Sequence, residues 1–315
     1  MTVLIGTQHG VFRAASDVLE TPERVLESGE TLRVRTLENH TGVFAASKSG
    51  LYRSVDGGMT WEDLGVPRAE VFSVSGSPDG SRLYAGTHPA HLYVSHDDGA
   101  TWDESTGFRS LPGRDDWHTP RHRNAARIRS LAVHSDAPNR IIAGVEVGGV
   151  HVSDDGGETW DPRRTTPGSE LDLQDDVHHL LAIRPETVIA ACGEGLFRTR
   201  DAGRSWSRLD DEGALTYFRE TYHHDGVLYA GVHTRPGTWA SGGGPAILAY
   251  HLDTETVERV ADPAEPSHAF VVAWASADGR ILAGTNTGQL LRREDGRLKA
   301  AGAVPAGIRS IATLA

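Results

Sequence analysis

Short apolar runs separated by glycine-containing turns recur along the whole chain. Pairs of such runs occur seven times, at 2–14 (TVLIGTQHGVFRA), 42–54, 82–94, 140–152, 187–198, 227–233 and 280–292. Apolar runs of this length, bounded by turns, predict β-strands rather than helices. A small residue near the end of the first run of each pair stands at positions 6, 46, 86, 144, 191, 231 and 284, so that neighbouring units lie 40 to 58 residues apart.

The period of these units decides the fold class. A repeat of about 40–50 residues that carries about four strands is typical of one blade of a β-propeller. Seven such units take up nearly all of the 315 residues. We therefore predict an all-β, seven-bladed β-propeller that forms a single domain over residues 1–315.

A third apolar run precedes most pairs and predicts the inner strand of each blade. Examples lie at 32–38, 71–77, 128–134, 177–183 and 269–275. The last run, GIRSIATLA at 307–315, resembles RIRSLAVHS at 127–135, but no pair follows it. The pair at 2–14 has no such run before it. We expect the C-terminal strand to pair with the N-terminal blade and close the ring, because pairing removes the exposed strand edges.

Four pairs are followed by the template Ser/Thr-x-Asp-x-Gly-x-Thr/Ser-Trp. Its aspartates and tryptophans are Asp56 and Trp61, Asp97 and Trp102, Asp155 and Trp160, and Asp201 and Trp206. The carboxylate can accept backbone N–H groups, the glycine permits positive φ, and the indole can be buried between blades. A calcium loop is the alternative, because DDGGE at 154–158 is similar to part of an EF-hand, but the full ligand spacing is absent. We interpret the four stretches as structural clamps.

The box and its period together resemble the Asp-box, or BNR-repeat, β-propellers. That group includes sialidases, xyloglucan-degrading enzymes, luminal sorting receptors and the photosystem II assembly propeller. The resemblance covers essentially the whole chain. It implies that each box joins the third and fourth strands of a blade, on the face opposite the functional site. The Arg-Ile-Pro motif of sialidases is absent and sialidases have six blades, so sialidase activity is not expected.

Composition and charge narrow the classes of function. The formal net charge is −12, and two of the 31 basic residues are lysines, so a general nucleic-acid binder is not expected. This acidic, lysine-poor composition suggests a salt-adapted, halophilic host. No window is apolar enough for a membrane span, and the N-terminus does not resemble a secretory signal, which predicts an intracellular, cytoplasmic protein. Cys192 is the single cysteine, which excludes an internal disulfide and indicates a buried apolar residue. We expect a monomer.

Two columns of residues are expected to overhang the central channel of the propeller. The first stands two positions after each small residue: Gln8, Lys48, His88, Glu146, Gly193, His233 and Asn286. The second stands near the start of each inner strand: Arg35, Phe72, Arg129, His178, Phe218, Phe270 and Arg309. Arginines crowded at a narrow axis repel one another unless an anion intervenes. Internal carboxylates such as Asp176, Glu146, Glu194 or Glu220, or a bound carboxylate or phosphate, can supply that charge.

The candidate site residues follow from these columns and from two insertions. The insertions, 111–128 and 234–246, each carry a tryptophan, Trp117 and Trp239, and are expected to wall the same mouth. The candidate catalytic residues are Glu146, Asp176 and His178. The candidate ligand-binding residues are Arg35, Arg129, Arg309, His88, Glu194, Arg219, His233, Trp117 and His118. No cofactor is predicted. A divalent metal on histidine and carboxylate ligands is chemically feasible, although no local ligand motif exists.

Two functions remain open on the sequence. One is the binding of a small polar, anionic ligand over the channel, with hydrolase or lyase chemistry of a glycosidase type on it. The other is a non-catalytic scaffold or assembly factor that presents the same face to a protein partner. Neither nucleic acid nor a membrane is an expected partner.

Overall fold

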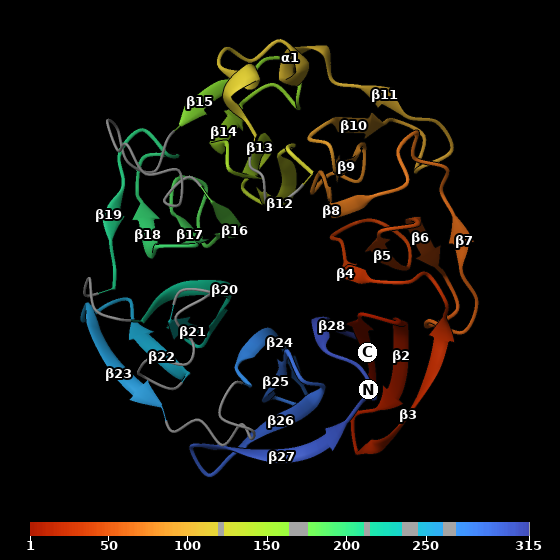
Figure 1. Cartoon of the computed structure of the whole chain (residues 1–315), viewed down its shortest axis with the longest axis vertical. Coiled ribbons are helices and arrows are strands. Elements are labelled where there is room, and N and C mark those ends of the chain that lie inside the picture. Colours follow the sequence, from red (N-terminus) through yellow and green to blue (C-terminus); the bar gives the residue numbers. More distant parts are fainter. Residues whose placement is uncertain (119–122, 164–175, 211–214, 235–244, 261–268, 315) are drawn as a thin grey trace.

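Seven four-stranded antiparallel sheets form a closed ring around a central channel in the computed structural model (Figure 1). The structure describes residues 1–118, 123–163, 176–210, 215–234, 245–260 and 269–314. Each sheet is one blade, and its strands run in sequence order from the channel outward, except in the blade that contains both termini. The predicted all-β, seven-bladed propeller is confirmed.

Four of the blades, each given from its inner strand outward, have the following strands. Blade 1 has β28 (Ile308–Leu314), β1 (Thr2–Thr7), β2 (Gly10–Ala15) and β3 (Val18–Leu26). Blade 2 has β4 (Thr31–Thr36), β5 (Val43–Ser47), β6 (Gly50–Ser54) and β7 (Glu62–Asp63). Blade 3 has β8 (Val71–Gly76), β9 (Leu83–Thr87), β10 (Leu92–Ser95) and β11 (Asp103–Glu104). Blade 4 has β12 (Arg127–His134), β13 (Ala137–Glu146), β14 (Gly149–Ser153) and β15 (Asp161–Arg163).

The other three blades follow the same order. Blade 5 has β16 (Val177–Ala182), β17 (Val188–Cys192), β18 (Gly195–Thr199) and β19 (Ser207–Arg208). Blade 6 has β20 (Leu215–His224), β21 (Val227–Thr234), β22 (Ala246–His251) and β23 (Thr256–Val260). Blade 7 has β24 (Val271–Ala277), β25 (Arg280–Thr285), β26 (Gln289–Glu294) and β27 (Arg297–Ala303). A short helix, α1 (Thr106–Arg109), and a 3-10 turn, η1 (Arg114–Asp116), lie between blades 3 and 4. No helix among the described residues is long and apolar enough to cross a membrane.

The second strand of each blade is buried on both faces because neighbouring blades cover it. This is why these strands appear in the sequence as continuous apolar runs rather than as an alternating pattern. The small residue in each run stands where the next blade approaches closely. A Cβ atom on Gly144 would lie 2.6 Å from Cγ1 of Val177, and one on Gly231 would lie 2.1 Å from the carbonyl oxygen of Val271. Cys192 is buried, as expected.

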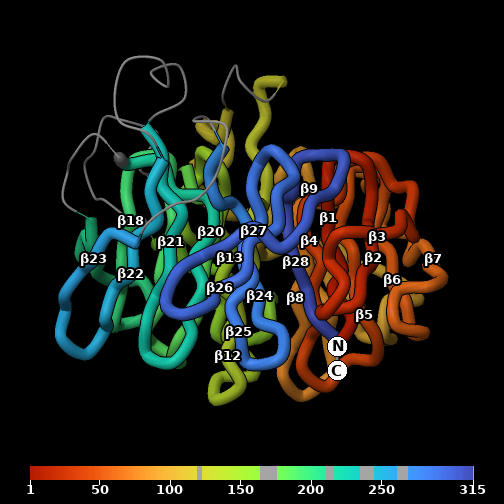
Figure 2. Tube along the Cα trace, turned by 90° about the horizontal axis from the view of Figure 1, so that it is seen from below, coloured from red at the N-terminus to blue at the C-terminus, as the bar shows by residue number. Residues whose placement is uncertain are grey.

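The ring closes through a blade that the two ends of the chain share. Strand β28 pairs antiparallel with β1, from Thr2 opposite Leu314 to Thr7 opposite Ile308. Figure 2 shows both termini together at one face of the ring. Strand β28 also packs against the inner strands β4 and β24 of the two neighbouring blades. The predicted pairing of the C-terminal strand with the N-terminal blade is confirmed.

The Asp boxes form tight turns between the third and fourth strands of blades 2 to 5, as the resemblance implied. In the second box, the Asp97 carboxylate accepts hydrogen bonds from the backbone N–H of Thr101 at 2.8 Å and from its hydroxyl at 2.6 Å. Ser95 donates to Asp97 at 2.8 Å and accepts from the N–H of Gly99 at 2.8 Å. Trp102 donates from Nε1 to the Leu64 carbonyl of blade 2 at 2.9 Å, which links two blades. The four box tryptophans are half-buried rather than enclosed.

The box carboxylates give the stability of the fold a defined pH dependence. Hydrogen bonds from Thr101 and Ser205 hold the pKa values of Asp97 and Asp201 at about 2. Hydrogen bonds from Thr159 do the same for Asp155, although partial burial opposes them. A carboxyl group whose pKa is depressed in the folded state stabilises the fold above its unfolded pKa, and this contribution is lost as the pH falls through the folded pKa.

We therefore expect the free energy of unfolding to fall as the pH is lowered from about 4 to about 2, the interval between the unfolded and folded pKa values. Urea unfolding measured across this range checks it. Asp97→Asn should reduce the slope of the free energy of unfolding against pH by the amount that corresponds to about one proton. The reason is that this variant no longer has the titrating carboxyl group. An unchanged slope in this variant would contradict the clamp role of Asp97.

Candidate functional site

The candidate site lies at the channel mouth on the face opposite the boxes. Inner strands begin at this face and second strands end there, which follows from the strand order of each blade. A cavity of about 190 Å³ occupies the mouth. We call it the arginine mouth, and its lining residues are Glu30, Leu32, Arg33, Lys48, Phe72, Arg127, Arg129, Arg219 and Arg309.

A β-bulge near the start of the inner strands determines which residues stand at equivalent positions. In blades 3, 4, 5 and 1 the inner strand has one residue that is passed over in the pairing with the second strand. These residues are Phe72, Arg129, His178 and Arg309 in turn. Those four members of the predicted column are therefore equivalent.

Three other members of that column were aligned wrongly. In blade 6 Phe218 is paired with Val232 ahead of the register shift, so the equivalent residue is Arg219. In blades 2 and 7 the equivalent residues are Leu32 and Val272, not Arg35 and Phe270. The sequence does not reveal which residue of the inner strand is passed over in the pairing. Alignment by the start of the strand therefore selected Arg35, which stands three residues beyond the equivalent position in β4.

Four of the cationic side chains at the mouth are bound to two internal carboxylates. Arg127 donates to both oxygens of Glu146, at 2.8 and 2.7 Å, and Arg129 donates to the same carboxylate. Glu146 raises the pKa of Arg129, although burial opposes it. Arg309 and Lys48 lie 2.7 and 2.5 Å from the carboxylate oxygens of Glu30.

Hydrogen bonds from Lys48 and Arg309 lower the pKa of Glu30 to about 2, against the opposing effect of burial. Both carboxylates of the mouth therefore form internal ion pairs. This part of the site matches the internal ion-pair alternative that the sequence left open.

Arg33 and Arg219 differ from the other arginines of the mouth. Arg33 donates to the carbonyl oxygens of Leu32 and His178, at 2.8 and 3.1 Å, and Arg219 donates to the Tyr217 hydroxyl at 2.9 Å. No ion pair joins either guanidinium to a carboxylate among the described residues.

The charge of these two arginines is correspondingly costly. Burial lowers the pKa of Arg33 to about 9, with added repulsion from neighbouring arginines, although Glu220 opposes the shift. Burial and Arg129 lower the pKa of Arg219. Two partly buried cations that form no ion pair among the described residues therefore line the mouth.

Arg35 lies deeper in the channel and bridges its walls. It contacts Oε1 of Glu220 in blade 6 at 2.6 Å and the hydroxyl of Ser310 in blade 1 at 2.8 Å. A second cavity, of about 250 Å³, has Arg35, Glu220 and His179 among its lining residues and lies toward the box face. The structure therefore brings Arg129, Arg219 and Arg309 together at the arginine mouth, and places Arg35 in the other half of the channel.

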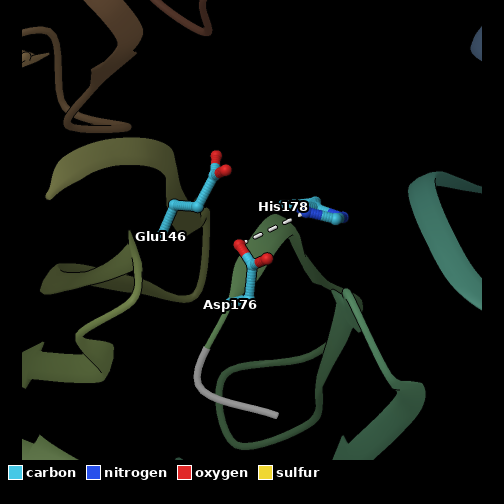
Figure 3. Close-up of side chains that lie close together, drawn as sticks. All are labelled: Glu146, Asp176 and His178. Atoms are coloured by element: carbon cyan, nitrogen blue, oxygen red, sulfur yellow. Dashed lines mark ion pairs between the residues drawn. The ribbon is translucent and has the colours of Figure 1, made fainter. Parts of the chain in front are cut away.

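The three candidate catalytic residues lie close together (Figure 3). One ligand atom from each of Glu146, Asp176 and His178 lies within 4.8 Å of the others. Nδ1 of His178 is 2.5 Å from the Phe218 carbonyl, so Nδ1 carries a proton and Nε2 faces Asp176 at 3.4 Å. Burial, reinforced by Arg129, lowers the pKa of His178.

The surroundings of this trio limit its chemistry. The three residues are 3%, 1% and 1% exposed, which leaves a substrate little surface to contact. Both oxygens of Glu146 accept from guanidinium groups, whose charge opposes a divalent cation. The arrangement therefore fits a buried ion-pair network better than a metal centre.

The remaining candidate ligand residues lie outside the arginine mouth. His88 contacts the Glu70 carboxylate at 2.6 Å, and His233 is buried with its ring 5.3 Å from that of Phe270. Glu194 is buried as well.

Trp117, His118 and other described residues of the first insertion line a separate cavity, together with Pro89 and Ala90, and not the arginine mouth as expected. This cavity, of about 420 Å³, shares no lining residue with the arginine mouth. Residues 119–122 and 235–244, including Trp239, lie outside the described residues.

Four mouth residues were missed by the sequence reasoning: Glu30, Leu32, Arg33 and Arg127. Arg33 and Arg127 each stand two positions before an arginine that was selected, and alternate residues of a strand point to the same side. That signal was available in RVR at 33–35 and RIR at 127–129.

The fold and the box define the class: the chain is a seven-bladed β-propeller with Asp-box repeats. The BNR/Asp-box repeat family matches at residues 151–162. No curated protein sequence matches the chain significantly.

Solved structures with a similar fold include two enzymes. An ancestral GH74 enzyme has a TM-score of 0.65 and 17% identity, over 91% of this chain and 39% of that chain. The GH74 xyloglucanase from Xanthomonas campestris has a TM-score of 0.63 and 17% identity, over 95% of this chain and 46% of that chain. The chain thus spans less than half the length of these enzymes.

A third similar structure is that of YCF48 bound to D1 peptide. It has a TM-score of 0.62 and 17% identity, over 95% of this chain and 84% of that chain. At this level of identity the three likenesses establish the fold alone.

Proposed function

We propose that the protein binds a small anionic ligand in the arginine mouth. The observation that carries this proposal is that Arg33 and Arg219 line the cavity without a carboxylate partner, whereas Arg127, Arg129 and Arg309 each have one. Burying a cation without a counter-charge is costly. A structural network would be expected to neutralise all of its arginines, while a site for an anion leaves donors for its ligand.

The arginine mouth suits carboxylate or phosphate groups in particular. A guanidinium offers planar pairs of N–H donors that match the oxygens of these groups. Phe72, whose ring lies 4.8 Å from the Arg127 guanidinium carbon, supplies an apolar wall beside the donors. Hydrolysis of a bound ligand stays a prediction. Glu146 and Asp176 are buried, and Glu146 is held by two arginines, which leaves a substrate little carboxylate surface to contact.

A non-catalytic scaffold is the second candidate, and one observation favours it. The chain covers 84% of YCF48, a protein solved with a bound peptide, but less than half of the GH74 chains. A protein partner with an acidic segment would place its carboxylates at the same mouth. Under this alternative, free small anions bind weakly and the same arginine variants lose the partner instead.

The test is anion binding by single arginine variants. Sulfate and succinate should raise the melting temperature of the unaltered protein at constant ionic strength. Arg33→Gln and Arg219→Gln should each weaken this binding by about 1.5–3 kcal/mol, the range for hydrogen bonds to charged groups. Isothermal titration measures the affinities.

The matched control is Arg140→Gln, because Arg140 is paired with Asp154 away from the channel. It should bind the anions as the unaltered protein does. Equal affinity in all four proteins, or no binding to any of them, would contradict the proposed function.

A further inference from the structure

We infer that the ligand of the arginine mouth is a compact anion with at least two negative charges, held by Arg33 and Arg219 together. This inference rests on the proposed function and specifies its ligand class. It follows from the charge of the mouth, from its volume and from the donors that remain available on the two arginines.

The charge of the lining exceeds what the protein itself neutralises. Six cationic side chains line the cavity: Arg33, Lys48, Arg127, Arg129, Arg219 and Arg309. Two carboxylates, Glu30 and Glu146, pair with members of this set. Six positive charges are thus paired with two negative ones. Glu220 and Asp176, which lie outside the lining, act on Arg33 and Arg129 and reduce the positive surplus that remains. A monovalent ligand would leave most of that surplus in place, whereas each further negative charge on the ligand relieves more of it.

The volume of the cavity limits the size of the ligand. About 190 Å³ corresponds to roughly six water molecules at about 30 Å³ each. A sulfate, a pyrophosphate or a short dicarboxylate fits such a space. A nucleotide or an oligosaccharide does not fit inside it as a whole, so the part of the ligand that enters the cavity is a small charged group.

Arg33 and Arg219 come from different blades and approach the same cavity. They belong to β4 of blade 2 and β20 of blade 6, and Arg219 contributes to the repulsion that lowers the pKa of Arg33. Nε and Nη2 of Arg219 make no hydrogen bond to the described residues. Both atoms are accessible to solvent, so they can donate to a ligand. One anion with two charged ends, or with a doubly charged head, can accept from both side chains and remove their mutual repulsion.

The experiment compares anions of similar size and different charge. Methanesulfonate and sulfate form one pair, and acetate and malonate form the other. Titration calorimetry at constant ionic strength should give at least about tenfold tighter binding for the divalent member of each pair. A tenfold ratio corresponds to the free energy of about one additional hydrogen bond to a charged group. In Arg33→Gln and in Arg219→Gln, the ratio of divalent to monovalent affinity should fall toward one. In Arg140→Gln it should remain unchanged.

The possible results separate this inference from the proposed function. Equal affinities for monovalent and divalent anions, with loss in both variants, overturn the divalent ligand and leave the anion site intact. No binding of any of the four anions overturns both. A high ratio that survives in both variants overturns the role of Arg33 and Arg219. Preference for sulfate alone or for malonate alone supports the inference and identifies the acid group. Circular dichroism melting of each variant establishes that it is folded before binding is measured.

Discussion

Deletion of residues 306–315 should abolish cooperative folding. The deletion removes β28, which is the inner strand of blade 1, together with the buried side chains of Ala306, Ile308 and Ile311. It exposes the edge of β1 and uncovers the faces of β4 and β24. It also takes Arg309 away from Glu30. Because a typical domain is stable by only about 5–15 kcal/mol, loss of a whole inner strand exceeds the margin.

Thermal unfolding and size-exclusion chromatography check this expectation, with a circular permutant as control. Residues Thr2 and Leu314 are paired neighbours, so a short flexible linker can join the two ends. New ends can be opened between Asp253 and Thr254, in the exposed turn that joins β22 and β23. The permutant keeps every strand and should melt cooperatively as a folded protein. A truncated protein that melts like the unaltered chain would overturn the shared blade.

The architecture could be predicted from the sequence because the same local rules act seven times. The second strand of each blade is buried on both faces, and this burial requires a continuous apolar run in the sequence. Every blade needs a small residue where its neighbour approaches, as at Gly144. The pair at 2–14 lacks an inner strand, and the run at 307–315 is an inner strand without a following pair. Together they predict the closure, since they complete one blade when the ring closes.

The site could be predicted only in part, because its geometry depends on single-residue shifts that leave no sequence signal. A bulge near the start of β4 makes Leu32, not Arg35, equivalent to Arg129. Arg35 therefore reaches Glu220 deep in the channel, and Arg33 lines the mouth. Pairings such as that of Arg35 join residues 185 positions apart, and no local pattern encodes them.

The chemical question that the sequence left open also needed coordinates. Composition and spacing could not say whether the arginines were neutralised internally or awaited a ligand. The structure divides them: Arg129 and Arg309 pair with internal carboxylates, while Arg33 and Arg219 do not. The distinction depends on side-chain directions, which the spacing of arginines along the chain does not specify.

Replacing Glu146 with glutamine should destabilise the protein by about 3–5 kcal/mol, the usual cost of leaving a buried charge without its partner. Glu146 is 3% exposed and is the carboxylate shared by Arg127 and Arg129. Glutamine keeps the shape of the side chain but removes the negative charge. Arg127 and Arg129 then lose the counter-ion that they share, which raises the repulsion across the mouth.

Arg129→Gln should cost less than Glu146→Gln, although both changes break the same ion pair. In the arginine variant, Glu146 keeps both of its hydrogen bonds from Arg127, at 2.8 and 2.7 Å, and one surplus cation is removed. Urea unfolding of the two variants measures the difference directly. Sulfate should recover more stability in Glu146→Gln than in the unaltered protein, because it replaces the missing charge. Equal losses in the two variants would contradict a surplus of positive charge at the mouth. Unchanged stability of Glu146→Gln would instead favour a catalytic role for Glu146, since its charge would then not be needed to hold the arginines.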